Sequence, residues 1–279
     1  MTQNALVPDI DDRALSRRQQ VILDMVQSQG FATLEALARH FNVSTQTIRR
    51  DVIHLDEAQL LQRFHGGAGL PENRVRLGHA HKRGVSAEGK EVIASAVAEI
   101  IPKGASVFLD VGTTVEAVAR ALRHVQGLRI FTCSLAAAMI LAGRETTEVF
   151  VTGGLVHGAD GSLVGDVAMS SIARFKFDYA VIGCSGFDDD GAPMDFDMQK
   201  VAVKQAVLSN SRQAIIVADA SKFARTAIVR IAPLSAFRLL ITDTNPSPRL
   251  RDLADTSSVD VIVTRGTSSP RSRASSSGT

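Results

Sequence analysis

The part of the sequence that most restricts the fold is a tight break between two helical patterns near residue 42. Apolar residues recur at helical spacing from Arg17 to about Gln29, from Thr33 to about His40, and from Ser44 to about Ala58. Asn42-Val43 interrupts the pattern, and Thr33 and Ser44 are residue types that cap helix N-termini. The pattern therefore predicts three helices with a tight turn between the last two, which is a helix-turn-helix arrangement.

A short strand pattern follows the third helix. Residues Leu61 to Ala68 have the composition of a strand that turns at Gly66-Gly67. Such a hairpin would pack against the third helix as a wing. We therefore expect a winged helix-turn-helix domain over residues 13–70, after a flexible N-terminus over residues 1–12.

One face of the third helix carries residue types that read or grip DNA. Ile48, Val52 and Leu55 form an apolar stripe toward the first two helices, so the polar residues point away from it. Arginine can bond guanine and glutamine can bond adenine in a bidentate manner, while hydroxyl groups hold phosphates. The predicted DNA-binding residues are Ser44, Thr45, Gln46, Thr47, Arg49 and Arg50, with Arg63 and His65 on the wing. A lone arginine is more often a solvated surface residue, but the whole arrangement favours double-stranded DNA as a partner.

Beyond Glu88 the pattern changes to short apolar β-rich runs that alternate with amphipathic helices. This alternation predicts an α/β domain over residues 88–263, with a mainly parallel sheet and covering helices. Residues 71–87 are expected to form a linker, and the Ser-rich residues 264–279 a disordered tail. The expected strands are Ser106–Val111, Leu128–Thr132, Val149–Thr152, Tyr179–Gly183, Ala214–Ala218, Leu239–Thr242 and Val259–Val263.

Two junctions at strand ends have the composition of an anion site. Asp110-Val111-Gly112-Thr113-Thr114 lies where a strand ends and a helix begins, so free N–H groups and threonine hydroxyls would face a phosphate. Lys222 follows another strand on the edge where ligands bind in open α/β sheets. Alone, the first could be a plain structural turn and the second a solvated lysine. The predicted effector-binding residues are Asp110, Gly112, Thr113, Thr114, Gly153, Gly154, Ser185, Gly186, Lys204 and Lys222.

The stretches Phe41 to Asp51 and Arg63 to Ala68 resemble the N-terminal signature of DeoR-type bacterial repressors. The resemblance implies a repressor whose sensor domain is similar to the ribose-5-phosphate isomerase fold and binds a phosphorylated sugar or polyol. The stretches around Gly112-Thr113-Thr114, Ser185-Gly186 and Ser221-Lys222-Phe223 imply glycerol 3-phosphate as that effector. Asp51 corresponds to a family acid and would orient Arg49 or Arg50, or else form a local salt bridge in the helix.

The chain departs from the family pattern at two places. Lys200 stands where family sensors usually carry an acid, and Thr132-Cys133-Ser134 replaces the usual Thr-Asn-Asn. Lys200 could point to solvent, could accept a more anionic ligand, or could alter effector sensing.

Charge and cysteine usage agree with a regulator inside the cell. The net charge is only +2, yet nine arginines face six acidic residues between Arg13 and Arg76. Cys133 and Cys184 lack the spacing of a metal site or a disulfide framework, so we expect a cytoplasmic protein without metal or cofactor. The N-terminus lacks the basic segment of a signal peptide, and no apolar run is long enough for a membrane span. We also expect a homo-oligomer, a dimer or tetramer, because a helix-turn-helix usually binds paired half-sites.

Three other functions compete with a ligand-responsive repressor. A sugar-phosphate isomerase would need a carboxylate base, and Lys200 argues against one. A hydrolase would need a complete nucleophile elbow, but Gly183-Cys184-Ser185-Gly186-Phe187 lacks its second glycine. A scaffold that only oligomerises would leave Asp110 and Lys222 without a ligand. We therefore predict no catalytic residues.

Overall fold

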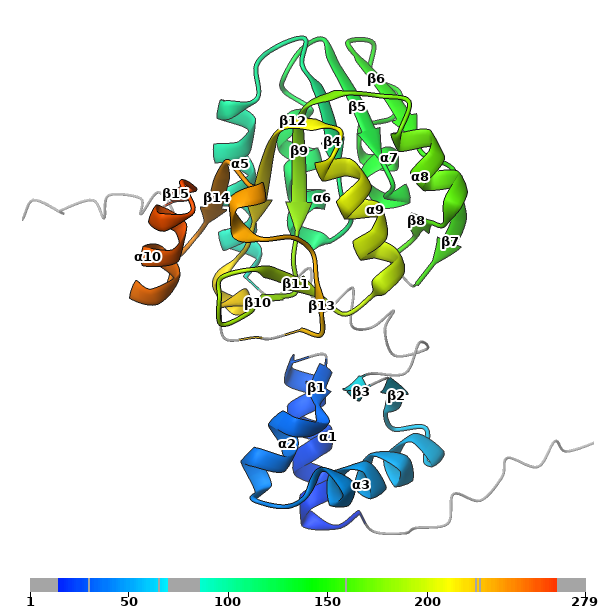
Figure 1. Ribbon diagram of the computed structural model, residues 1–279. Helices are drawn as coiled ribbons and strands as arrows, with labels where there is room; N and C mark the ends of the chain where they lie inside the picture. Colours follow the sequence, from blue (N-terminus) through cyan, green and yellow to red (C-terminus); the bar gives the residue numbers. More distant parts are fainter. Residues whose placement is uncertain are drawn as a thin grey trace, which may run out of the picture. The chain divides into compact units, whose positions relative to one another are not determined.

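The computed structural model describes residues 15–29, 31–64, 66–69, 86–158, 160–223, 225 and 227–264. The chain divides into two compact units, Met1–Pro71 and Glu72–Thr279 (Figure 1). The predicted flexible N-terminus, residues 71–85 of the predicted linker, and the tail beyond residue 264 lie outside the described residues. None of the helices in the described ranges is long and apolar enough to cross a bilayer.

The first unit contains the three predicted helices. Thr33 Oγ1 accepts a hydrogen bond from the Ala36 N–H at 3.0 Å, and Ser44 Oγ accepts one from the Thr47 N–H at 3.1 Å. Asn42 ends the second helix in the left-handed conformation, with φ of 51°. These caps fix the tight turn. The helices are α1 (Arg17–Gln29), α2 (Leu34–Phe41) and α3 (Thr45–Glu57).

The predicted wing forms, but it contains an additional strand. Strands β2 (Gln62–Phe64) and β3 (Gly67–Gly69) pair antiparallel around Gly66, whose φ is 86°. Strand β3 also pairs with β1 (Phe31–Thr33), which lies directly before α2. Three residues are too few to show a strand period, so β1 was absent from the sequence prediction. The wing is therefore hydrogen-bonded to the segment that leads into the helix-turn-helix.

All seven predicted strands join one sheet in the second unit. The order is β15-β14-β12-β9-β4-β5-β6, and every adjacent pair is parallel. The predicted mainly parallel α/β architecture is therefore confirmed. The strands are β4 (Ser106–Leu109), β5 (Leu128–Thr132), β6 (Thr147–Val151), β9 (Phe177–Gly183), β12 (Ser211–Val217), β14 (Leu239–Thr242) and β15 (Asp260–Val263).

Helices cover both faces of this sheet (Figure 1). Val107 and Leu109 of β4 pack on one face and Phe108 on the other, as the two-residue period of a strand requires. The first face is covered by α5 (Ala87–Ile100), α6 (Thr113–Leu122) and α7 (Leu135–Leu141). The second is covered by α8 (Asp166–Ile172), α9 (Met198–Leu208) and α10 (Pro248–Thr256).

Two small antiparallel additions were not predicted. Strands β7 (Leu155–His157) and β8 (Ser162–Val164) form a hairpin, while β10 (Gly186–Phe187), β11 (Pro193–Asp195) and β13 (Val229–Arg230) form a separate sheet. Close backbone approach explains two glycines. A Cβ on Gly154 would lie 2.6 Å from Val164 O, and one on Gly186 would lie 2.2 Å from Arg225 O.

The two units have separate apolar cores, so we predict that they can be destabilised separately. Leu37 is fully buried in the core of the first unit and Leu122 in that of the second. Leu37→Ala should cost about 2–5 kcal/mol, because truncation leaves a cavity. Scanning calorimetry of the full chain should show only the first unit melting earlier. Leu122→Ala is the reciprocal control, and a single transition shifted equally by both variants would contradict separate units.

Candidate nucleic-acid interface and ligand site

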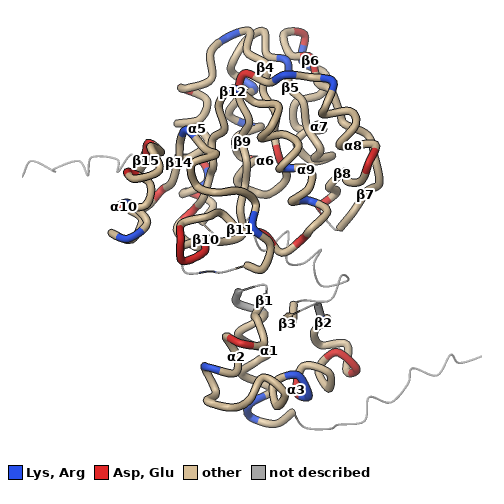
Figure 2. Tube along the Cα trace, viewed as in Figure 1, with Lys and Arg blue, Asp and Glu red and all other residues tan. Residues whose placement is uncertain are grey.

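The third helix, α3, presents a polar face opposite its buried stripe. Ile48, Val52 and Leu55 are at most 1% exposed, as the stripe predicted. Figure 2 shows basic residues along this helix and acidic residues toward its C-terminal end. Of the predicted DNA-binding residues, Ser44, Thr45, Gln46, Arg49, Arg50 and Arg63 are exposed, Thr47 is half-buried, and His65 lies outside the described residues.

Some of these residues also have structural partners. Ser44 Oγ caps α3 and lies 2.9 Å from Thr47 Oγ1, so both hydroxyls are partly engaged. The Arg63 N–H donates to Asp56 Oδ1 at 3.1 Å, which ties the wing to α3. Gln46 and Arg50 project from the face opposite the stripe, where a base edge could be reached.

The structure corrects the role expected for Asp51. Within the described residues its carboxylate forms no hydrogen bond with Arg49 or Arg50, and it accepts instead from Arg18 Nε at 2.6 Å and Nη2 at 3.2 Å. This pair joins α3 to α1, so it is not a local salt bridge of the helix either. Asp51 is 6% exposed, and its bidentate partner fixes the angle of α3 against the first helix. The side chain therefore positions the polar face as a whole.

The second candidate site lies where the connections of the sheet change direction. Strands β4 and β9 are neighbours, but the chain leaves β4 through α6 toward β5 and leaves β9 through α9 toward β12. These two helices cover opposite faces. Such a switch point opens a crevice at the carboxyl ends of the strands, where open α/β sheets bind ligands.

A buried ion pair lies at this switch point. Lys204 Nζ pairs with Asp110 Oδ2, donates to Gly183 O at 3.0 Å and lies 3.4 Å from Asp195 Oδ2. Asp110 Oδ2 also accepts from the Gly183 N–H at 3.0 Å. Burial acts to lower the pKa of Lys204, but the charges of Asp110 and Asp195 raise it above its ordinary value. Lys204 therefore keeps its proton, although its side chain is only 1% exposed.

The N-terminus of α6 follows this pair directly. Gly112 precedes the helix with φ of 120°, a conformation that favours glycine, and makes no side-chain cap. Thr114 is buried and Thr113 is half-buried. The first N–H groups of a helix have no partner within the helix, and they carry positive potential. The predicted junction between a strand and a helix is therefore present from Asp110 to Thr114, and its carboxylate is paired with Lys204.

The other predicted effector residues lie around the same edge in differing surroundings. Ser185 follows β9, and its Oγ donates to Asp195 Oδ1 at 3.0 Å. Lys222 is half-buried at the end of a short 3-10 helix, η1 (Ala220–Lys222), that follows β12. Gly153, Gly154 and Gly186 occupy tight turns or close approaches, which account for them without a ligand.

Lys200 is paired with an acidic residue. Of the three possibilities for this lysine, a side chain that only points to solvent does not fit. Its Nζ donates to Asp160 Oδ2 at 2.6 Å, and the side chain is 16% exposed. Nearby, His157 Nε2 and Asp197 Oδ2 are 2.7 Å apart. Both contacts join the β7–β8 hairpin to the start of α9. Asp160 was missed from the sequence because it lies on a hairpin whose strands are too short to predict.

Cys184 does not have the character of a nucleophile. Burial raises the pKa of its thiol to about 12, so the thiolate is scarce near neutral pH. Burial also raises the pKa of the Cys133 thiol. In the described part of the chain, no group of three or more His, Cys, Asp and Glu side chains could hold a metal ion.

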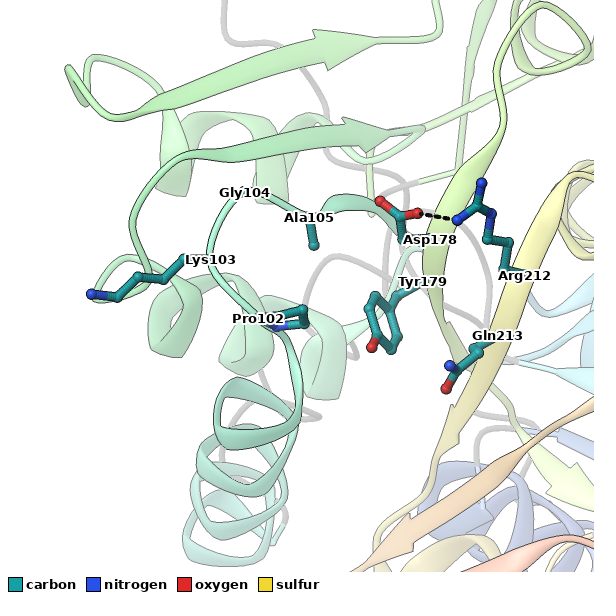
Figure 3. A pocket seen from close by; sticks show the side chains of 8 residues that line it. All are labelled: Pro102, Lys103, Gly104, Ala105, Asp178, Tyr179, Arg212 and Gln213. Atoms are coloured by element: carbon teal, nitrogen blue, oxygen red, sulfur yellow. Dashed lines mark ion pairs between the residues drawn. The ribbon is translucent and has the colours of Figure 1, made fainter.

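A hollow of about 350 Å³ lies at the opposite edge of the sheet, where strands β4, β9 and β12 begin (Figure 3). Its lining includes Lys103, Tyr179 and Arg212, and Arg212 pairs with Asp178 at 3.5 Å. None of the predicted effector residues lines it. Amino ends of strands are not the ligand-binding edge of open α/β sheets, so we do not assign the effector to this hollow.

Comparison with known families gives two adjacent matches. Residues 18–74 match the DeoR-like helix-turn-helix domain, and residues 85–244 match the DeoR C terminal sensor domain. Together the two matches extend from the second residue of α1 to just beyond β14, with residues 75–84 between them.

Two curated relatives are similar over most of the chain. The glycerol-3-phosphate regulon repressor of Escherichia coli (strain K12) is 40% identical over 231 residues, which are 83% of this chain and 92% of the relative. The HTH-type transcriptional repressor CsqR of the same organism is 36% identical over 246 residues, which are 88% and 94% of the two chains. Both relatives are named as repressors, which supports a regulator rather than an enzyme.

The solved structures with a similar fold include ribose 5-phosphate isomerase A from Methanocaldococcus jannaschii. It has 15% sequence identity and a TM-score of 0.36, over 48% of this chain and 53% of that chain. The likeness is distant.

The Arg18–Asp51 contact leads to a prediction about the DNA-binding unit. Asp51→Ala should lower its stability by about 1–2 kcal/mol, because a charge-assisted pair is lost at a site where Arg18 is partly solvated. Arg18→Ala should have a similar effect, and the double variant should cost clearly less than the sum. Chemical denaturation measures all three, and Arg17→Ala at an exposed neighbour is the control. Fully additive effects would show that the two side chains do not act as a pair.

Proposed function

The chain belongs to the DeoR family of transcriptional repressors, and we propose that a phosphorylated sugar or polyol, glycerol 3-phosphate in particular, controls its affinity for operator DNA. The family matches and the named relatives support repression. The observation that carries the ligand proposal is the switch point of the sheet, where the N-terminus of α6 adjoins the buried Asp110–Lys204 pair.

In this proposal α3 enters the major groove with its polar face toward the bases. Gln46 and Arg50 read base edges, while Thr45, Thr47 and Arg49 hold the backbone. Ser44 places the helix N-terminus near a phosphate. Arg63 and His65 of the wing reach a flanking phosphate or the minor groove. The exposure of the described members of this set other than the half-buried Thr47 supports the assignment.

The effector would bind at the carboxyl edge of the sensor sheet. Its phosphate would accept hydrogen bonds from the backbone at Gly112, Thr113 and Thr114, with Lys222 supplying charge. Asp110 and Lys204 would shape the floor of the site, because each satisfies the other and is nearly inaccessible. Ser185, Gly186, Gly153 and Gly154 would line its rim.

Glycerol 3-phosphate is the first effector to test. The relative with 40% identity is named for this metabolite. Lys200 brings no uncompensated charge, because Asp160 neutralises it at 2.6 Å. This pairing supports a ligand with a single phosphate over a more anionic one.

We further propose that the protein works in the cytoplasm as a homo-oligomer, a dimer or tetramer. A helix-turn-helix reads one half-site, so two copies related by symmetry would read a paired operator. An effector-blind oligomerisation domain is the alternative. It predicts operator binding that no phosphorylated metabolite changes.

Arg50 allows a test of sequence-specific DNA binding. Arg50→Ala should weaken specific operator binding by about 1–3 kcal/mol if its guanidinium contacts a base, and should leave effector affinity unchanged. Fluorescence anisotropy with operator and scrambled duplexes measures the loss. Arg123→Ala, at an exposed arginine of the sensor unit, is the matched control. Equal losses for both duplexes would assign Arg50 to the phosphate backbone instead.

Lys222 allows a test of the response to the effector. Saturating glycerol 3-phosphate should weaken operator binding by the wild type roughly fivefold or more. Lys222→Ala should hold the operator but lose this response, because the ligand phosphate loses a cationic partner. Lys103→Ala is the control, since this exposed lysine lines the hollow at the other edge. If only Lys103→Ala lost the response to glycerol 3-phosphate, the effector site would be assigned to that hollow instead.

A further inference from the structure

The first turn of α5 is anchored to the loops at the ends of β12 and β14. A Cβ on Gly89 would lie 1.9 Å from Asp243 Oδ2, so the helix backbone approaches that carboxylate closely. Beside it, Lys90 Nζ lies 4.0 Å from Asp219 Oδ2. The side chains of Lys90 and Asp219 are 5% and 1% exposed. The first turn of α5 is therefore held by charged groups that are buried away from water.

Asp219 also organises the turn that carries Lys222. Its Oδ1 accepts from the Ser221 N–H at 3.0 Å and from the Ser221 hydroxyl. Asp243 Oδ1 accepts from the Ala220 N–H at 2.8 Å. One oxygen of Asp219 thus holds the turn that ends at Lys222, while the other faces Lys90.

The contact between Lys90 and Asp219 is long for a buried pair. Asp219 Oδ2 is buried and accepts no hydrogen bond from the described residues. Charge-assisted hydrogen bonds of this kind usually measure about 2.7–2.9 Å. Burial lowers the pKa of Lys90, and the positive charges of Lys222 and Arg225 act in the same direction, while the negative charges of Asp219 and Asp243 raise it. A bound anion would offset the repulsion from Lys222. Lys90 could then approach Asp219 and complete the hydrogen bond.

We propose that the Lys90–Asp219 pair transmits effector binding from the turn at Lys222 to the first turn of α5. Residues 71–85, which lie outside the described residues, connect α5 to the DNA-binding unit along the chain, so α5 is the first described element of the sensor unit after that connection. Lys90 and Asp219 are positioning residues in this scheme, and neither needs to touch the ligand. The inference rests on the proposed function, because it assigns a route to the response of the same site.

The test compares full-length wild type, Lys90→Met and Glu91→Gln. Glu91 is the matched control, because it neighbours Lys90 and pairs with Arg120 at 2.7 Å on the exposed side of α5. Operator affinity is measured with and without glycerol 3-phosphate, and calorimetry measures binding of glycerol 3-phosphate itself. Lys90→Met should bind operator DNA and glycerol 3-phosphate as the wild type does. The factor by which glycerol 3-phosphate weakens its operator binding should fall from roughly fivefold or more to near unity. Glu91→Gln should keep the full response.

A Lys90→Met variant that is released as strongly as the wild type would overturn the inference. If this variant does not fold, Asp219→Asn carries the same expectation, because its Oδ1 can still accept from Ser221 while the charge is gone. A wild type that ignores glycerol 3-phosphate would refute the proposed effector instead. In that case, hydrogen exchange of the backbone amides of residues 90–94 tests the Lys90–Asp219 contact without any ligand. It should be faster in Lys90→Met than in Glu91→Gln, and equal rates would show that the pair does not hold α5.

Discussion

The buried pair between Asp110 and Lys204 fixes the geometry on which the sensor unit depends. It joins the end of β4 to α9 and, through Gly183, to the end of β9. A buried charge is tolerated only with a partner in good geometry, so this pair permits few alternative arrangements of the three elements. The junction at Gly112 follows β4 directly, and Ser185 follows β9. The positions of both therefore depend on a contact between residues 94 positions apart.

The sequence predicted the regular part of the fold well, for a physical reason. Strands covered on both faces are continuous apolar runs, and all seven runs entered one parallel sheet. The strands that were missed contain two or three residues, such as β1 and β10. Their pairing depends on backbone groups far away along the chain, and no local period encodes it.

The candidate sites show the same division. Residues at strand ends could be grouped in advance, because the carboxyl ends of parallel strands meet at one edge. The partners of charged side chains could not. Asp51 pairs with Arg18 across 33 positions and Lys200 with Asp160 across 40, and neither spacing has a local meaning. In the sequence Lys200 appeared to be a cation without a counter-charge. In the fold it forms an ion pair with Asp160 that has no net charge.

The separation of the cores has a consequence for engineering. The buried residues of the first unit, such as Ile22 and Leu37, pack in a cluster distinct from the two that line the sensor sheet. Each unit can therefore change in sequence without repacking the other, and a different DNA-binding domain could be fused before α5. The position at which the two proteins are joined then matters. It must keep Gly89 and Lys90 on the sensor side, because these residues belong to the packing of that unit.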